Sequence, residues 1–236
     1  MSNPSFKFKQ FTIYHDKCAM KVGTDGVLLG AWAPVDNTKR ILDVGTGTGL
    51  IALQLAQRNQ QATITALEID AAAAEQATEN VQRSPWPDRV EVVCIDFRNY
   101  QSVEKFDLIV SNPPYFIDAL KCPDEQRRMA RHTGGLNYDL LFRRSAHLLG
   151  EQGRVSIIIP AEAESAVIDA AWNHKLYPLH RTRVFTKPGK PCRRVLLTFS
   201  FQNEGCVEDS LCIEMEKHNE YTPEYRALTR DFYLKG

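Results

Sequence analysis

The chain has 236 residues, of which 43% are hydrophobic and 25% charged, so it can bury the core of one sizeable globular domain. Its 29 basic residues balance 29 acidic ones, and this neutrality argues against an indiscriminate nucleic-acid binder. The sequence lacks an apolar run of about 18 residues, an apolar leader and a Cys-x-x-Cys pair. We therefore expect a cytoplasmic protein with reduced thiols, no membrane span, no metal site and no obligate protein partner.

The predicted elements alternate between strands and helices along most of the chain. Residues 6–13 alternate apolar and polar side chains, as a half-buried strand does, and residues 221–234 are typical of an amphipathic helix whose aromatic side chains pack in the core. Between them we expect strands near 41–45, 64–69, 90–95, 106–111, 153–159, 178–186 and 194–201, and helices near 48–58, 70–82, 138–149 and 161–173. This alternation predicts an α/β fold with a parallel sheet covered by helices on both faces. The loop 187–193 is too short for a helical crossover, so the last two strands should form an antiparallel hairpin.

The first of the core strands runs into a glycine-rich turn. Gly45, Gly47 and Gly49 alternate with threonines, and a helical apolar pattern follows. A strand, a glycine turn and a helix are the context of a cofactor-binding loop, because small residues let a ligand approach the backbone. Asp43 precedes this loop; an acid there would repel a pyrophosphate and attract an ammonium group. The pattern favours S-adenosylmethionine, which carries an ammonium and no phosphate, over NAD, whose loop reads G-x-G-x-x-G.

The next two strands also end in acids. Glu68 lies 19 residues after Gly49, about the separation at which a second strand brings a carboxylate to ribose hydroxyls. Asp96 ends the third strand, where it could accept a hydrogen bond from an adenine amino group, and Phe97 could cover the adenine ring. Open α/β sheets bind ligands along the carboxyl ends of their strands, so we expect these side chains to share one cofactor site.

The fourth strand leads directly into Asn112-Pro113-Pro114-Tyr115. Asn112 offers a side-chain carbonyl, the backbone of Pro113 offers a second, and neither proline has an N–H group that would compete for them. Two acceptors at one turn suit a planar –NH2 group, and the Tyr115 ring could stack on a planar substrate. The predicted acceptor is therefore the amino group of a nucleobase or of a side-chain amide, and Asn112 would also border the cofactor. A Pro-Pro turn that merely ends a strand is the alternative.

Two basic segments are candidates for contact with a phosphate backbone. A polar stretch over residues 116–137 follows the catalytic turn and should lie over the active site, with Arg127, Arg128 and Arg131 facing phosphates. Residues 170–203 contain no acid, and this stretch includes Lys187, Lys190, Arg193 and Arg194. A positive surface here could grip RNA, while solvated charges are the alternative in both segments.

With these residues in hand, the chain resembles the class I S-adenosylmethionine-dependent methyltransferases that carry Asn-Pro-Pro-Tyr. Residues 19–32 look like the N-terminal motif of that branch, which lies beside the cofactor, so Lys21 and Thr24 are expected to bind it. From about Phe6 to Leu234, including Ser84-Pro85-Trp86 and residues 194–197, the chain is similar to the bacterial tRNA1(Val) (adenine(37)-N6)-methyltransferase family.

The resemblance implies a Rossmann-like fold with a seven-stranded, mostly parallel sheet and a C-terminal antiparallel strand. It implies one methyltransferase domain, with a cofactor-flanking segment 1–35, a core 36–203 and an extension 204–236. The implied activity is methyl transfer from S-adenosylmethionine to adenine N6 in a tRNA anticodon loop. The motifs leave open a protein-glutamine N5-methyltransferase, a guanine-N2 rRNA methyltransferase, a non-catalytic S-adenosylmethionine- and RNA-binding protein, and an NAD-dependent dehydrogenase.

Overall fold

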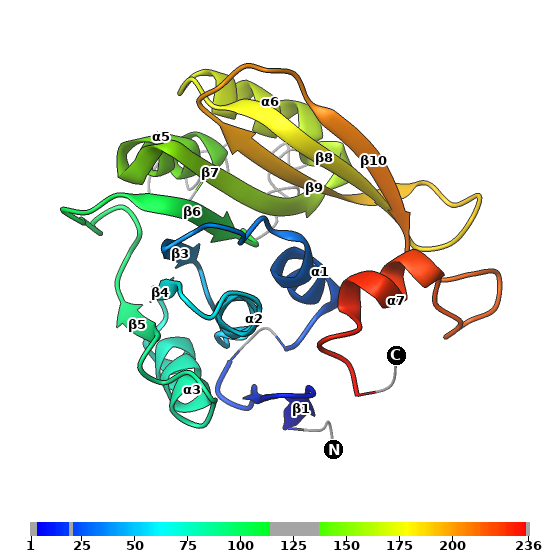
Figure 1. The fold of residues 1–236 in the computed structure, drawn as a ribbon, viewed down its shortest axis with the longest axis horizontal. Helices are drawn as coiled ribbons and strands as arrows, with labels where there is room; N and C mark the ends of the chain where they lie inside the picture. The colour runs from blue at the N-terminus through cyan, green and yellow to red at the C-terminus, as the bar shows by residue number, and fades with distance from the viewer. Residues whose placement is uncertain (1–3, 19–20, 114–136, 235–236) are drawn as a thin grey trace, which may run out of the picture.

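The computed structural model describes residues 4–18, 21–113 and 137–234. Its centre is an eight-stranded sheet in the order β10-β8-β9-β7-β6-β3-β4-β5 (Figure 1). The strands are β3 Arg40–Val44, β4 Thr63–Glu68, β5 Val90–Cys94, β6 Phe106–Ser111, β7 Leu149–Pro160, β8 Tyr177–Phe185, β9 Cys192–Ser200 and β10 Val207–Cys212. The predicted α/β class is confirmed, and each of the seven predicted core strands is present, with an eighth added.

The strand directions follow the prediction, apart from this eighth strand. Strands β5, β4, β3, β6 and β7 are parallel, while β9 lies between β7 and β8 and is antiparallel to both. The antiparallel hairpin is thereby confirmed. Strand β10 lies at the sheet edge, parallel to β8, and falls within residues 204–236, for which the sequence predicted an extension outside the core. Its residues 207–210 are exposed and include two acids, so the apolar pattern that marks a buried strand is missing there.

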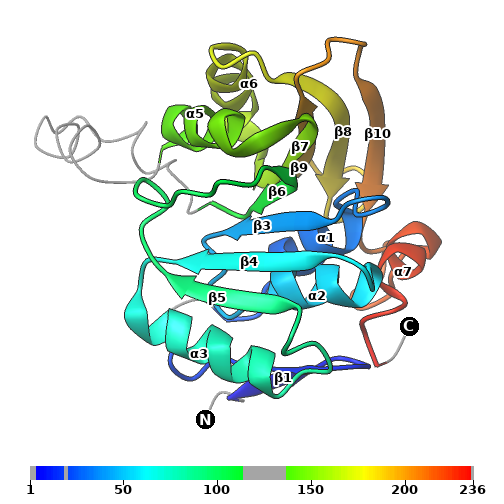
Figure 2. The same cartoon turned by 60° about the vertical axis from the view of Figure 1, so that its left-hand side comes forward.

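Helices cover both faces of the sheet, as Figures 1 and 2 show. They are α1 Thr24–Trp32, α2 Leu50–Arg58, α3 Ala71–Gln82, α5 Tyr138–Leu148, α6 Glu164–Trp172 and α7 Pro223–Thr229, with a short 3-10 turn, η2 Ala161–Ala163, before α6. Successive residues of β3 point to opposite faces of the sheet, as in any strand. Ile41 packs in the core on the side of α1 and α2, and Leu42 packs in the core on the side of α5 and α6. Within the described ranges, no helix has the length and apolarity needed to cross a membrane.

The N-terminal segment forms a hairpin instead of the single predicted strand. β1 (Ser5–Lys7) pairs antiparallel with β2 (Thr12–Tyr14), separately from the main sheet. Three apolar side chains of this hairpin are buried, those of Phe8, Phe11 and Ile13. The turn residues 9 and 10, between Phe8 and Phe11, are exposed. The alternation of apolar and polar residues therefore continues through a reversal of the chain, which the pattern alone does not reveal.

The C-terminal segment contains the predicted helix in a shorter form. Thr222 caps α7 through its hydroxyl, which accepts a hydrogen bond from the Tyr225 N–H at 3.2 Å. Tyr225 and Phe232 are buried in the core shared with α1 and α2, which confirms that these aromatic side chains serve packing.

Helix α1 was not predicted from the sequence. Its two glycines explain both the weak helical pattern of this segment and the close packing of the helix against α2. Gly26 and Gly30 weaken the helical signal. A Cβ atom at Gly30 would lie 2.6 Å from Cδ of Gln54, and one at Gly26 would lie 3.0 Å from Cδ2 of Leu50. The glycines thus let the two helices touch, which places the first turn of α1 against the first turn of α2.

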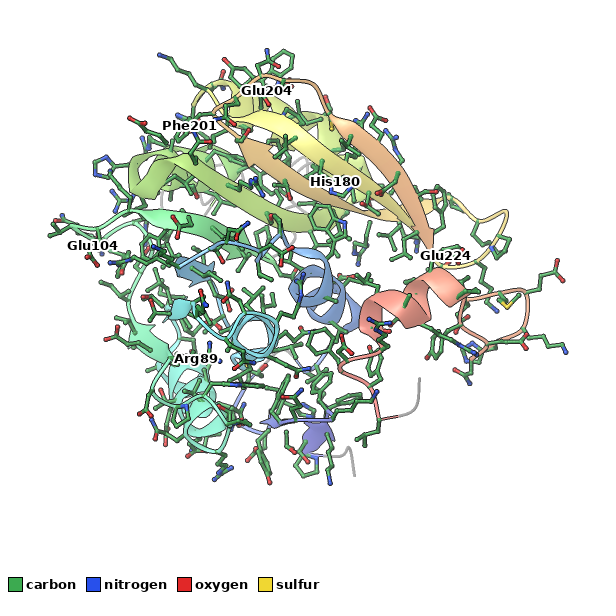
Figure 3. All side chains as sticks on the ribbon, viewed as in Figure 1. Arg89, Glu104, His180, Phe201, Glu204 and Glu224 are labelled. Atoms are coloured by element: carbon green, nitrogen blue, oxygen red, sulfur yellow. The ribbon has the colours of Figure 1, made fainter. Side chains whose placement is uncertain are left out.

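The far end of α1 is fixed to β8. The Trp32 indole N–H donates to the Thr182 hydroxyl at 2.9 Å. Its ring also packs against His180 of β8, which is labelled in Figure 3, in a tilted arrangement with 4.8 Å between the ring centroids. Contacts with α2 and β8 therefore hold both ends of α1, and its N-terminus stays beside the glycine-rich turn.

Candidate active site

The glycine loop between β3 and α2 presents open backbone. Gly45, Gly47 and Gly49 have φ angles of 73°, 57° and 82°, a region that side chains disfavour. A Cβ atom added at Gly45 or Gly47 would meet none of the described residues within 4 Å, whereas at Gly49 it would contact Ala77 of α3 at 3.5 Å. The first two glycines therefore leave room for a ligand, and the third allows a helix to pack on the loop.

Asp43 lies beneath this loop and is 0% exposed. Its Oδ2 accepts a hydrogen bond from the Thr46 hydroxyl at 2.6 Å, while its buried Oδ1 has no hydrogen-bond partner in the described part of the chain. The pKa of Asp43 is raised to about 7, chiefly by burial and to a small extent by the charge of Glu68, against the opposing effects of the Thr46 hydroxyl and the Ala52 backbone. The carboxyl group thus shapes the loop from below.

Glu68 connects the glycine loop to the start of α3. Its carboxylate accepts backbone hydrogen bonds from Gly47 at 2.9 Å, Ile69 at 2.8 Å and Asp70 at 3.0 Å. The spacing between Gly49 and Glu68 predicted that Glu68 lies near the glycine loop, and these contacts agree with that prediction. Ile69, which sequence reasoning missed, is 65% exposed at the same strand end. A large apolar side chain directly after a strand-end acid is the sequence feature that points to it.

The third strand end places its two candidate residues differently. Asp96 accepts hydrogen bonds from the Arg98 side chain and, at 2.8 Å, from the Arg98 N–H. These hydrogen bonds lower the pKa of Asp96, which therefore stays ionised. Phe97 is only 5% exposed and packs in the core on the side of α5. The structure leaves little of its ring for stacking on an adenine, because the apolar side chain turns inward from the strand end.

The acceptor turn begins beside the glycine loop. Ser111, the last residue of β6, is fully buried and donates a hydrogen bond from Oγ to the Val44 carbonyl at 2.8 Å. Val44 and Ser111 are also register partners, so Gly45 and Asn112 follow at neighbouring strand ends about 5 Å apart. Asn112 is partly exposed. The structure thus brings the predicted acceptor residue to the predicted cofactor loop, and Ser111 is a link that the motif did not reveal.

Several predicted residues of this turn and of the following stretch lie outside the described residues. They are Pro114, Tyr115, Arg127, Arg128 and Arg131. Pro113 is the last described residue of the turn, and it is buried.

The first turn of α1 completes the site. Lys21 and Thr24 are exposed beside it, and the N-cap residue Gly23 provides no side-chain cap. Backbone N–H groups at such a helix start favour a carboxylate or another anion. Asp25 pairs with Arg194 of β9, with 2.9 Å between Oδ2 and Nε, which ties this helix start to the sheet.

The stretch without acids is neutralised in part by acids from elsewhere in the chain. The Lys187 ammonium lies 3.4 Å from the Glu214 carboxylate, and Arg194 is engaged by Asp25. Of the four basic residues that were predicted to contact RNA within this stretch, Lys190 and Arg193 are exposed, and Lys187 and Arg194 are partly buried. The hairpin turn that carries Lys187 and Lys190 lies near α7 at the right of the sheet in Figure 1.

A model of the family described as "Methyltransferase small domain" matches residues 22–166, which is more than half of the chain. The chain belongs to this family. The matched region of this methyltransferase includes the glycine loop, Glu68 and the Asn112 turn.

Curated relatives match the whole length of the methyltransferase. A protein of Bacteroides thetaiotaomicron is 58% identical over 99% of both chains, and one of Tolumonas auensis is 46% identical over 100% of this chain and 99% of its own. Both carry the name tRNA1(Val) (adenine(37)-N6)-methyltransferase.

Solved structures confirm the fold. A predicted O-methyltransferase from Agrobacterium tumefaciens superposes with a TM-score of 0.71 at 20% identity, covering 88% of this chain and 96% of that one. A TehB-like SAM-dependent methyltransferase from Corynebacterium glutamicum gives a TM-score of 0.51 at 20% identity, covering 76% and 89%. The Rossmann-like methyltransferase architecture expected from the sequence is thereby confirmed.

Proposed function

We propose that this methyltransferase transfers a methyl group from S-adenosylmethionine to N6 of adenine 37 in tRNA1(Val). The observation that carries the proposal is the junction of the acceptor turn with the glycine loop, held by the hydrogen bond from Ser111 to Val44. The full-length similarity to a 58% identical relative with that name supports the choice of substrate.

The described residues fit S-adenosylmethionine in chemistry and in placement. The open backbone at Gly45 and Gly47 allows close approach of the ligand. The Glu68 carboxylate is oriented by backbone N–H groups, and it keeps lone pairs for ribose hydroxyls. The buried Oδ1 of Asp43, beneath the loop, offers a further acceptor. When bound, the cofactor supplies an electrophilic methyl group on a sulfonium sulfur.

Residues near the loop would hold the two ends of the cofactor. The uncapped start of α1, with Lys21 and Thr24, suits the carboxylate of the amino-acid moiety. Asp96 remains ionised and can accept from the adenine amino group, while the exposed Ile69 offers an apolar surface to the ring. Ile69 takes over the role that Phe97, packed in the core, is poorly placed to fill.

Asn112 and Pro113 activate the acceptor nitrogen. The lone pair of an adenine amino group is delocalised into the ring, which makes the nitrogen a weak nucleophile. Hydrogen bonds from its two N–H groups to the Asn112 side-chain oxygen and the Pro113 carbonyl favour a tetrahedral nitrogen with a localised lone pair. Positive charge develops on this nitrogen as the new bond forms, and the same two acceptors stabilise it. The surplus proton then leaves to water, and alignment of the reacting atoms supplies much of the remaining acceleration.

The RNA loop that contains adenine 37 makes the base accessible. A base in a single-stranded loop costs less to unstack than one in a duplex. We assign stacking on the extruded adenine to Tyr115. We further propose that six basic residues contact the flanking phosphates: Arg127, Arg128, Arg131, Lys187, Lys190 and Arg193.

A methyl-transfer assay on defined RNA tests the proposal. Purified protein with labelled S-adenosylmethionine should modify tRNA from cells that lack the protein, and nucleoside analysis should yield N6-methyladenosine. An in vitro transcript of tRNA1(Val) should accept the label, and the same transcript with guanine at position 37 should not. Label in methylated guanosine, or in protein alone, would instead support a guanine-N2 or a glutamine-N5 methyltransferase.

A further inference from the structure

Asn80 of α3 joins two segments that lie far from it in the sequence. Its side chain is 0% exposed. Its Nδ2 donates to the Thr48 carbonyl and to the Tyr14 carbonyl, both at 2.9 Å, and its Oδ1 accepts from the Tyr14 N–H at 2.9 Å. These bonds use both N–H donors and the carbonyl of the side-chain amide.

The bond to Thr48 fixes the backbone of the glycine loop. The Thr48 carbonyl and the Gly49 N–H belong to one planar peptide group, so holding either atom orients both. The Gly49 N–H donates to the Thr46 carbonyl at 3.0 Å. Asn80 thus holds from the buried side a loop whose residues Gly45 and Gly47 face open space.

The bonds to Tyr14 fix the segment that leads to α1. One helical turn before Asn80, the fully buried Gln76 accepts a hydrogen bond from the Lys17 N–H at 3.1 Å. The chain continues from there to Lys21 and Thr24. Gln76 therefore holds the N-terminal segment alone, whereas Asn80 holds both this segment and the glycine loop.

We propose that Asn80 is a positioning residue that sets the glycine loop and the N-terminal segment in the arrangement that binds the methyl donor. The inference rests on the proposed function, because it takes S-adenosylmethionine as the ligand. It assigns a role to a side chain that does not itself contact the cofactor. Removing the amide leaves the buried Thr48 carbonyl and the part-buried Tyr14 carbonyl without this donor, and the Thr48 carbonyl can regain a partner only if the backbone shifts. Such a shift weakens cofactor binding and leaves the RNA-contacting surface in place.

Asn80→Ala and the matched control Gln76→Ala test the proposal, because each removes one buried amide from the same face of α3. Calorimetric titration with S-adenosylmethionine in the absence of RNA should give a Kd for Asn80→Ala about tenfold above that of the wild type. The Kd of Gln76→Ala should rise clearly less, by at most about threefold, because Gln76 holds the N-terminal segment and not the glycine loop, although both variants unfold at lower temperature. At saturating S-adenosylmethionine the kcat of Asn80→Ala and its KM for tRNA should return to within about twofold.

An unchanged Kd for Asn80→Ala, or an equal rise in both variants, would overturn the inference, because it would reduce Asn80 to general support of the helix. Should the alanine variant not fold, Asn80→Ser is measured by the same criteria, since its hydroxyl can replace one donor and should give an intermediate Kd. A wild-type protein that binds no S-adenosylmethionine would contradict the proposed function itself, so the two failures are distinguishable.

Discussion

Replacing Asp43 with asparagine should change how the stability of the protein depends on pH. Asp43 is fully buried, and its pKa is raised from 3.8 to about 7, chiefly because burial removes the carboxylate from water. The native carboxyl group therefore keeps its proton over a pH range in which the unfolded chain releases it. As pH rises from about 4 to about 7, the contribution of Asp43 to the free energy of unfolding falls, and above that range it is constant.

The magnitude follows from the two pKa values. A rise from 3.8 to about 7 corresponds to roughly 4 kcal/mol, at about 1.4 kcal/mol for each pKa unit. Asparagine retains an oxygen that can accept from the Thr46 hydroxyl and cannot ionise. The free energy of unfolding of Asp43→Asn, minus that of the wild type, should thus increase by a few kcal/mol between pH 4 and pH 7 and then level off.

Urea denaturation at half-unit steps from pH 4 to pH 8 measures this difference directly. Groups that titrate equally in both proteins cancel in the subtraction. Asp70→Asn, at the exposed N-cap of α3, controls for the loss of one negative charge at this edge of the sheet. Parallel stability curves for the wild type and Asp43→Asn would refute the reasoning, because the carboxyl group would then titrate alike in the folded and unfolded chains.

Three further substitutions test the packing of α1 and the basic hairpin. Gly30→Ala should lower the free energy of unfolding by about 1–3 kcal/mol, because the new methyl group would lie 2.6 Å from Cδ of Gln54. When Gln54→Ala is added to the same chain, urea denaturation should show that part of the lost stability returns. Arg193→Glu should weaken tRNA binding and reduce the salt slope of log K by about one, because Arg193 is exposed on the hairpin. Arg194→Glu should instead lower the melting temperature and raise the Kd for S-adenosylmethionine, since it breaks the pair with Asp25 at the start of α1. Equal losses of tRNA affinity in the two variants, measured by filter binding at several salt concentrations, would contradict this division of roles.

The strand ends of the candidate site could be predicted because each combines a buried apolar run with one polar residue. The glycine loop, Glu68 and Asn112 follow such runs, and the rule that ligands bind at the carboxyl ends of parallel strands brings them together. The hydrogen bonds from Ser111 to Val44 and from the Gly47 N–H to Glu68 confirm this proximity. Local pattern and sheet topology were sufficient for these residues.

Features that depend on distant partners could not be predicted in this way. The pair between Arg194 and Asp25 joins residues far apart in the sequence, so Arg194 looked like part of a free basic surface. The burial of Asp43 and the contacts of Asn80 likewise depend on packing that no single segment encodes. Strand β10 was missed because most of its residues are exposed at the sheet edge, so its sequence lacks the apolar pattern of a buried strand. Its strand conformation depends on pairing with β8, which the local sequence does not reveal.

The central claim, that the Asn112 turn activates the acceptor nitrogen, is tested most directly by Asn112→Ala. Single-turnover methylation of tRNA1(Val) should slow by about two to three orders of magnitude, because an acceptor that stabilises charge in the transition state is lost. The Kd for S-adenosylmethionine should stay within about threefold, because the glycine loop and Glu68 remain in place. Wild-type turnover in this variant, or a loss of rate explained entirely by lost cofactor binding, would contradict the account.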